Sequence, residues 1–227
     1  AQRIQEDYLR ILRFFRFHAW YGDPKGGLDA EGLAACAMHT DGLAGLSRER
    51  VSAEILKLLG AADPAPSVAA MRSVGVLMAV LPGAEDRALG PLVHLESVTD
   101  TPPDAIRRLA VLGGQDVTAG LRLSKAQARR LAHLREGALG TMGAAELGYR
   151  YGMVEGLDIL VLRAAFLEQP LAAGYGDDLA QGSAARFPVK AADLMPSYRG
   201  AALGAQLAKL EKRWIASGFR LGRDDLV

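Results

Sequence analysis

The fold is decided near the N-terminus by the stretch EDYLRILRFFRF, which occupies residues 6–17. The apolar residues in and before it recur every three or four positions: Ile4, Tyr8, Ile11, Leu12 and Phe15. That interval places them on one face of an α-helix. The pattern predicts a helix over residues 3–21, which ends at the glycine-rich loop 22–27. The aromatic side chains of this helix are expected in the core: Phe14, Phe15, Phe17 and Trp20. The alternative is that a nucleotide base stacks against one exposed member of this group.

Helical signals continue through the rest of the chain. Asp29, Ser47 and Ser124 are residues of the kind that cap helix N-termini, and each precedes a helical pattern. The expected helices cover residues 29–40, 47–59, 67–80, 86–98, 102–112, 124–136, 144–167 and 200–216. The segment 170–190 is polar and rich in glycine, so we expect mostly loop around a short helix there. The sequence predicts an all-α fold, built from short helices in contiguous subdomains rather than a simple up-and-down bundle.

Composition narrows the class of protein. Of the 227 residues, 50% are hydrophobic and 23% are charged, which is typical of a globular chain. The net charge is only +1. Such a balance argues against a protein that coats nucleic acid without specificity, because that task needs a large excess of Lys and Arg. A local basic groove remains compatible with it.

The chain has one cysteine, Cys36, in an apolar stretch, so we expect a buried thiol in a reducing compartment. No apolar run reaches the length of a transmembrane helix, and no signal peptide opens the chain. We therefore expect a cytoplasmic protein with no membrane partner. Residue 1 is alanine and a patterned helix follows at once, so we also expect this chain to begin in the middle of a longer protein.

Asp7 and Arg10 carry the chemistry that the opening stretch suggests. On one helix they would share a face, and Glu6 would lie one turn from Arg10. The carboxylate only accepts hydrogen bonds and the guanidinium only donates them. Cytosine and adenine each offer an amino donor beside a ring-nitrogen acceptor, so both match this edge. Uracil and guanine offer the inverse order, and each unsatisfied group would cost roughly 1–3 kcal/mol. A rigid Asp/Arg pair could thus accept C and A and reject U and G.

Taken without context, the same residues make an ordinary salt bridge on a solvated helix face, which contributes about 0.3–0.5 kcal/mol. The pattern E-D-x-x-R spans five positions and arises often by chance. Further motifs in the sequence are therefore needed to decide between a base-reading pair and a surface salt bridge.

Further motifs resemble a known family. Residues 6–17 look like the E-D-x-x-R motif in the neck of class II tRNA nucleotidyltransferases, which are the CCA-adding enzymes and their bacterial poly(A) polymerase relatives. Residues 46–59, LSRERVSAEILKLL, resemble the S-x-E-R-I-x-x-E helix that braces this motif. Later segments are similar to the body and tail of the same enzymes and follow in the same order: 75–82, 121–124, 187–194, 200–204 and 214–215.

The resemblance implies roles for individual residues. Asp7 and Arg10 would read the nucleotide base, Glu6 would orient Arg10, and Arg13 would support the site or contact phosphate. Three residues of the second motif would be structural braces: Glu49, Arg50 and Glu54.

The resemblance also implies a division of labour along the chain. Residues 1–60 would form a neck-like nucleotide-selecting domain, 61–137 a body-like helical domain, and 138–227 a tail-like RNA-binding domain. The partners would be tRNA and CTP or ATP. The parent enzyme would be a nucleotidyltransferase that adds CCA or poly(A), two activities that share this neck motif.

One departure from the family is decisive. Nucleotidyl transfer needs clustered carboxylates that hold Mg²⁺, and the family carries them on a G-x-D-x-D turn in a catalytic head. This sequence has no such motif. Its two aspartate pairs, Asp177-Asp178 and Asp224-Asp225, are adjacent residues and lack the D-x-D spacing. We expect no catalytic residue, metal ligand or cofactor in this chain, and Mg²⁺ in a head domain of the same protein. The chain alone should be catalytically inactive.

Two open points remain in the sequence. Four basic residues could contact RNA phosphates: Arg122, Lys125, Arg129 and Arg130. A solvated helix face is the simpler account of them. For the whole chain, the alternative is a stand-alone helical module that binds RNA or protein and has no head. A helix-turn-helix regulator that uses residues 121–136 fits less well, because it would need a more basic recognition helix.

Overall fold

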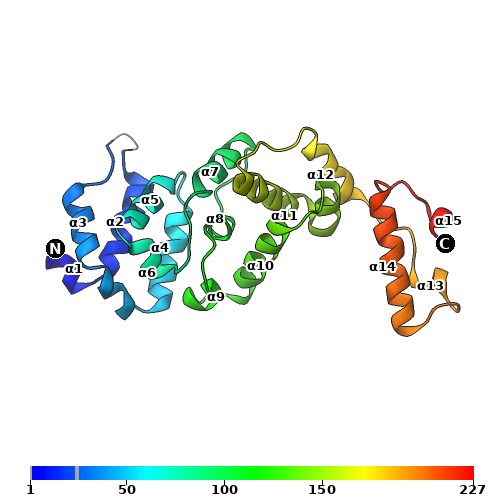
Figure 1. Ribbon diagram of the computed structural model, residues 1–227, viewed down its shortest axis with the longest axis horizontal. Coiled ribbons are helices and arrows are strands. Elements are labelled where there is room, and N and C mark those ends of the chain that lie inside the picture. The colour runs from blue at the N-terminus through cyan, green and yellow to red at the C-terminus, as the bar shows by residue number, and fades with distance from the viewer. Residues whose placement is uncertain (1, 24–25) are drawn as a thin grey trace. The chain divides into compact units, whose positions relative to one another are not determined.

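The computed structural model describes residues 2–23 and 26–227 and is α-helical, as the sequence predicts (Figure 1). Within these residues, β-structure is limited to one isolated bridge between Ala84 and Gly113. In chain order the helices are α1 (Gln2–Glu6), α2 (Leu9–Tyr21), α3 (Ala30–Met38), the 3₁₀ helix η1 (Thr40–Gly45), α4 (Arg48–Leu59), α5 (Ala65–Ser73), α6 (Val76–Val80), α7 (Leu89–Val98), α8 (Ala105–Leu112), α9 (Val117–Gly120), α10 (Lys125–Leu139), α11 (Ala144–Leu167), α12 (Tyr175–Ala184), α13 (Ala191–Leu194), α14 (Gly200–Ala216) and α15 (Arg223–Leu226).

The three predicted N-caps are confirmed. The Asp29 carboxylate accepts a hydrogen bond from the Gly32 amide at 2.6 Å and starts α3. The Ser47 hydroxyl accepts one from the Arg50 amide at 3.4 Å and starts α4. Ser124 forms a capping box at the start of α10. These bonds satisfy amides that have no partner inside the helix, which is why such residues mark helix starts so reliably.

Three predicted helices are interrupted. The helix expected over 3–21 is broken between α1 and α2, at Asp7 and Tyr8. The helix expected over 67–80 is broken where Gly75, with φ of 78°, separates α5 from α6. The helix expected over 144–167 contains Gly152 at φ 76° and ψ −177°. Glycine adopts these backbone angles without the steric penalty of a Cβ, so a glycine inside a helical pattern marks these two breaks.

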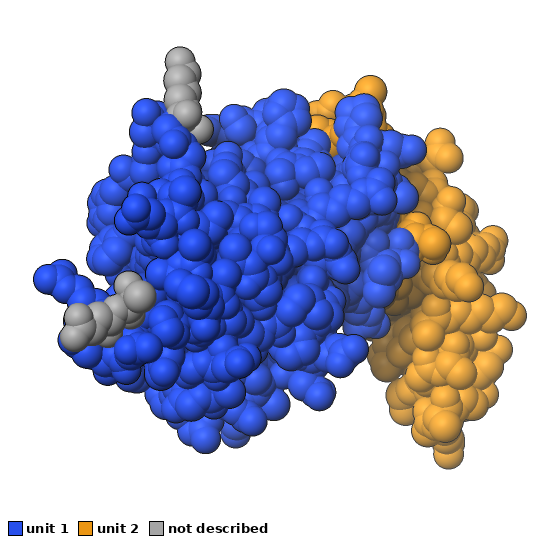
Figure 2. Space-filling model, turned by 60° about the vertical axis from the view of Figure 1, so that its left-hand side comes forward, with its two compact units in different colours: residues 1–140, 161–170 blue, residues 141–160, 171–227 orange. Residues whose placement is uncertain are grey.

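The chain divides into two compact units, coloured separately in Figure 2. Unit 1 comprises residues 1–140 and 161–170, and unit 2 comprises residues 141–160 and 171–227. Helix α11 contributes residues to both units. The predicted division into neck, body and tail domains at residues 1–60, 61–137 and 138–227 stays a prediction.

In unit 1, α2 packs against α4 and α5. The buried side chains of α2 are Leu9, Ile11, Leu12 and Phe15, and they recur at the predicted spacing. The thiol of Cys36 in α3 is buried as expected, and burial raises its pKa to about 11. This core fixes α2 against α4, the two helices that carry the motifs at 6–17 and 46–59.

A buried ionic cluster lies deeper in unit 1. Glu96 of α7 accepts hydrogen bonds from Arg107 and Arg108 of α8, with Nε-to-oxygen distances of 2.9 Å in both cases. All three side chains are 3% exposed or less. Arg108 also donates to backbone carbonyls at the end of α4 and just past it, to Leu59 at 2.7 Å and to Ala62 at 3.0 Å. The cluster therefore ties the C-terminal end of α4 to α7 and α8.

Unit 2 contains a close helix crossing and an aromatic core. A Cβ on Gly182 of α12 would lie 1.8 Å from the Ala145 carbonyl oxygen of α11, so only glycine fits this contact. Farther along the chain, Trp214 of α14 and the buried Val189, Leu194, Leu210 and Leu226 form a small core.

Within the described residues, no helix combines the length and apolar character needed to span a bilayer.

Candidate functional site

Asp7 lies in the turn between α1 and α2 rather than on a continuous helix. Its Oδ1 accepts a hydrogen bond from the Leu9 amide at 3.1 Å. Its backbone carbonyl accepts one from the Arg10 amide at 3.0 Å. The expectation that Asp7 and Arg10 share a helix face is therefore wrong, because Asp7 precedes the N-cap of α2. The turn still keeps the two residues next to each other in the fold.

Arg50 of α4 holds the Asp7 carboxylate in place. Its Nη2 lies 3.1 Å from Asp7 Oδ1 and 3.0 Å from Oδ2. Partial burial tends to raise the pKa of Asp7, but the Leu9 amide and the Arg50 guanidinium outweigh it and lower that pKa. Asp7 is therefore an ionised acceptor at neutral pH, with its orientation set by two donors.

Glu54, one turn further along α4, braces the next part of α2. Its side chain is 8% exposed and accepts from Arg16 Nε at 2.6 Å and from Arg13 Nε at 3.5 Å. Arg13 also lies 4.0 Å from Asp7. The Arg16 guanidinium lies over the ring of Phe17, 4.4 Å from its centroid. Ion pairs and a cation–π contact thus fix the side of α2 that faces α4.

Arg10 is held more loosely than Asp7. Its Nη2 lies 3.7 Å from Glu6 Oε2, and the two side chains are 43% and 63% exposed. The contact is the predicted one between Glu6 and Arg10, and an exposed pair of this kind restrains a side chain weakly. The site thus combines a fixed acceptor, Asp7, with an adaptable donor, Arg10.

The remaining predicted residues divide into paired and exposed ones. Glu49 pairs with Arg122, which precedes α10, so its contact joins α4 to a later part of unit 1. Arg130 pairs with Asp104 at 2.7 Å. Lys125 and Arg129 are exposed on α10. Of the four basic residues, Arg122 and Arg130 therefore serve intramolecular contacts, and Lys125 and Arg129 face solvent.

The aromatic residues of α2 differ from expectation. Phe15 is fully buried, but Phe17 and Trp20 are each 49% exposed. The prediction that Phe17 and Trp20 lie in the core is wrong. The buried face of α2 is too narrow to include every aromatic residue of the helix. The Trp20 indole donates to the Lys57 carbonyl at 2.8 Å, and that bond holds the ring near the end of α4.

In the described ranges, no three His, Cys, Asp or Glu side chains come together in a way that could hold a metal ion.

Sequence reasoning identified the main participants of the site but not their pairing. Arg50 and Glu54 were expected as braces, whereas their partners Asp7, Arg13 and Arg16 lie 38 to 43 positions away. The sequence indicates this pairing only through spacing. Arg13 and Arg16 lie three positions apart on α2, and Arg50 and Glu54 lie four positions apart on α4, so each pair shares a helix face.

A helical chain whose Asp/Arg motif is clamped by a second charged helix has the arrangement expected of a nucleotidyltransferase neck. Comparisons with known proteins agree. The family model described as "Probable RNA and SrmB- binding site of polymerase A" matches residues 28–87. The mouse protein named CCA tRNA nucleotidyltransferase 1, mitochondrial, is 28% identical over 240 residues, which cover 100% of this chain and 55% of the mouse protein. The human protein of that name is 55% identical over 58 residues, which cover 26% of this chain and 13% of the human protein.

Solved structures share the fold. The Thermotoga maritima CCA-adding enzyme complexed with tRNA matches with a TM-score of 0.63 and 15% identity, covering 98% of this chain and 60% of that one. A CCA-adding enzyme with ATP gives a TM-score of 0.64 at 16% identity, covering 97% and 58%. Another with CTP gives 0.58 at 15% identity, covering 96% and 61%. Over its whole length the chain is similar to part of a CCA tRNA nucleotidyltransferase, and it shares the fold of the corresponding part of CCA-adding enzymes. It spans 55% of the length of the mouse relative.

Proposed function

We propose that this chain is the nucleotide-selecting and RNA-binding part of a tRNA nucleotidyltransferase that adds CCA to tRNA 3′ ends. Asp7 and Arg10 read the base of the incoming CTP or ATP. The observation that carries the proposal is the clamp on Asp7, whose carboxylate is oriented by Arg50 and the Leu9 amide. Relatives named as CCA-adding enzymes support CCA addition rather than poly(A) addition.

The clamp explains how a protein could select bases without a template. The ionised Asp7 accepts from the exocyclic amino group that C and A share. Arg10 donates to the neighbouring ring nitrogen of either base. The weak restraint from Glu6 lets Arg10 adjust to the different sizes of C and A, while the fixed Asp7 keeps the order of acceptor and donor. U and G would leave both protein groups facing like partners.

The phosphoryl-transfer step belongs to another part of the same protein. We propose that Mg²⁺ and its carboxylate ligands lie in a catalytic head. The present chain would contribute base recognition and tRNA binding to that head. The alternative of a stand-alone RNA- or protein-binding module makes Asp7 and Arg10 irrelevant to function, so the same variants distinguish the two proposals.

The test is base selectivity in a protein that contains the head. Asp7→Ala and Arg10→Ala should each reduce the preference for CTP over UTP in single additions to tRNA lacking CCA. We expect this preference to fall about tenfold or more. In each variant the removed side chain can no longer bond the correct base or oppose the mismatched one. Arg87→Ala, which alters an exposed pair elsewhere in unit 1, is the matched control. Unchanged selectivity in both variants would reject the role of the pair.

The compartment is a separate proposal. We propose the cytoplasm, which suits a free buried thiol such as Cys36. The mouse and human relatives are mitochondrial by name. Imaging of the tagged full protein in cells of its source decides between the two compartments.

A further inference from the structure

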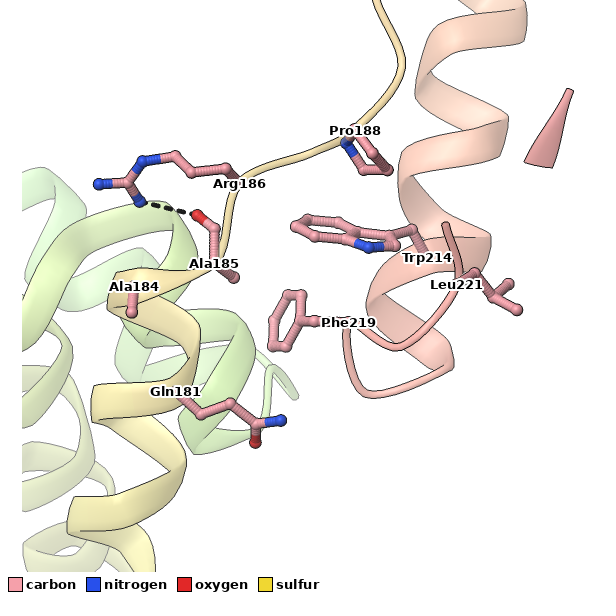
Figure 3. A pocket seen from close by; sticks show the side chains of 8 residues that line it. All are labelled: Gln181, Ala184, Ala185, Arg186, Pro188, Trp214, Phe219 and Leu221. Atoms are coloured by element: carbon pink, nitrogen blue, oxygen red, sulfur yellow. Dashed lines mark hydrogen bonds between the residues drawn. The ribbon is translucent and has the colours of Figure 1, made fainter. Parts of the chain in front are cut away.

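Unit 2 contains a hollow lined by aromatic and basic side chains (Figure 3). Its volume is about 490 Å³, which is within the range of small-ligand sites. It is lined by residues from the end of α12, from the segment 185–188, from the last turns of α14 and from the loop after α14. Six lining residues matter for recognition: Gln181, Arg186, Pro188, Trp214, Phe219 and Leu221.

The aromatic wall of this hollow is held firmly. The rings of Trp214 and Phe219 lie 4.9 Å apart in an edge-to-face arrangement. Trp214 is only 3% exposed and packs against Tyr149, with 5.3 Å between the ring centroids. The Tyr149 hydroxyl donates to Glu211 at 2.7 Å. Phe219 is partly exposed, and Figure 3 shows its ring between Trp214 and the α12 residue Gln181. A flat ligand would therefore meet a rigid aromatic surface.

Arg186, at the edge of the hollow, adds a positive charge, and Figure 3 shows its guanidinium directed away from the two rings. Arg186 is exposed, and its Nη1 donates to the carbonyls of Ser183 at 3.0 Å and Ala185 at 2.7 Å. The Gln181 amide donates to the Gly218 carbonyl at 3.3 Å and ties α12 to the loop that carries Phe219. Both contacts use backbone acceptors, so the Arg186 charge is not neutralised by a carboxylate.

The surroundings of the hollow are the basic part of the chain. Residues 186–227 carry eight Lys and Arg against four Asp and Glu, whereas residues 1–185 carry 19 against 22. Lys209, Lys212 and Arg213 are exposed within one turn of α14. Among the described residues, Arg223 is the one cation of this segment that forms an ion pair, with Asp193 at 3.1 Å. This charge favours a polyanion over a neutral peptide.

We propose that this hollow receives an unstacked base of bound RNA, which packs on Phe219 while Arg186 and the basic turn of α14 contact phosphates. The proposal rests on the RNA binding included in the proposed function and adds a base-contacting site to it. Aromatic faces beside exposed cations form the usual surface for single-stranded nucleic acid, because every base has a face to stack. The contact would therefore favour unpaired nucleotides of any sequence.

The experiment measures binding of the full chain to a ten-nucleotide oligouridylate and to an abasic strand with the same phosphates. Uridine is chosen because the Asp7/Arg10 pair is proposed to reject uracil. The wild type should bind oligouridylate about fivefold more tightly than the abasic strand, near the lower end of the stacking energies seen for single bases. Phe219→Leu keeps the apolar volume but removes the stacking face, so it should abolish this preference.

Arg186 provides an independent readout. Arg186→Gln should weaken binding to both strands and reduce the slope of log affinity against log salt by about 0.7, the value for one phosphate contact on a single strand. Phe166→Leu makes the same change to a half-exposed ring in unit 1 and should leave both measurements unchanged. Thermal unfolding of each variant checks that the fold is retained.

The outcomes separate this inference from the proposed function. RNA binding that is equal for the two strands, or equally affected by Phe219→Leu in both, would overturn the base site and leave RNA binding intact. No measurable binding of either strand, or of tRNA, would overturn the RNA-binding proposal as well. A base preference that persists in Phe219→Leu would mean that another surface recognises the base.

Discussion

Two arginine–carboxylate clusters in unit 1 use the same chemical groups in opposite surroundings. In the buried cluster, Glu96 lies between Arg107 and Arg108, and all three side chains are 3% exposed or less. In the cluster around Asp7, Arg50, which pairs with Asp7, and Arg10, which pairs with Glu6, are 49% and 43% exposed. The first cluster has its donors directed at protein oxygens, whereas the second keeps hydrogen-bonding capacity directed at solvent. Exposure, not ion-pair chemistry, separates a structural cluster from one that can bind a ligand.

The comparison predicts that the stability of the chain depends most on the buried cluster. Glu96→Gln leaves two buried guanidinium groups without their counter-charge and should lower the free energy of unfolding by about 3–5 kcal/mol. Urea unfolding followed by circular dichroism measures this change. Glu136→Gln, on the exposed face of α10, is the matched control and should change stability by less than about 0.5 kcal/mol. A loss below about 1 kcal/mol for Glu96→Gln would remove the distinction between the clusters.

Glu54 is the buried anchor of the exposed cluster, so it should give the second largest effect. Glu54→Gln weakens the charge-assisted bonds to Arg16 and Arg13 and should cost about 1.5–3 kcal/mol. The same urea experiment gives the value. In a head-containing protein, this variant should also reduce the preference for CTP over UTP, because α2 is no longer held against α4. A stability loss without any change in base preference would show that the brace does not position the site.

Asp104 lies between the two extremes of exposure, at 29%. It caps α8 through the Arg107 amide at 2.7 Å and pairs with Arg130, so Asp104→Ala should cost about 1–2 kcal/mol at pH 7. Burial tends to raise the pKa of Asp104, but the bonds from Arg130 and the Arg107 amide lower it below its ordinary value of 3.8. A lowered folded-state pKa stabilises the fold above the unfolded-state pKa.

The pH dependence follows from that sign. The deficit of Asp104→Ala should be constant from pH 7 to about 5 and should shrink as the pH falls below 3.8, where the wild type loses the stabilisation from the carboxylate. Unfolding measured across this range tests the shift. A deficit that grows on acidification would contradict the direction of the pKa change.

Glu6 should contribute least to stability and yet matter for function. Glu6→Gln removes one exposed contact to Arg10 and should change the free energy of unfolding by about 0.5 kcal/mol or less. Base selectivity of the head-containing protein should fall measurably, because Arg10 loses the ion pair with Glu6 that restrains its side chain. A large stability loss from this variant would place Glu6 with the structural cluster instead.

The sequence anticipated what depends on near neighbours. Asp29, Ser47 and Ser124 were recognised as caps because each cap bonds a residue three positions away. The partnership of Asp7 with Arg50 spans 43 positions, so only the likeness of two motifs suggested that their helices meet. Arg107 and Arg108 could not be placed in a core, because charged residues are rarely buried unless a partner such as Glu96 is known. Phe17 and Trp20 were misplaced because aromatic content alone does not set the width of a buried helix face.

The unit 2 hollow illustrates the same limit. Phe219 and Arg186 lie 33 positions apart, and neither belongs to a motif that the sequence made visible. Only the fold brings the aromatic wall and the guanidinium to one surface. Basic residues of this segment, in contrast, could be counted directly from the sequence.

The most direct test of the central claim is a crystal structure of the head-containing protein with bound CTP. The account predicts that a carboxylate oxygen of Asp7 lies within about 3.2 Å of the cytosine amino group and that Arg10 donates to the neighbouring ring nitrogen. Arg50 should remain on Asp7 in that complex. A cytosine bound elsewhere, with Asp7 and Arg10 still paired to Arg50 and Glu6 alone, would contradict the assignment of base selection to this pair.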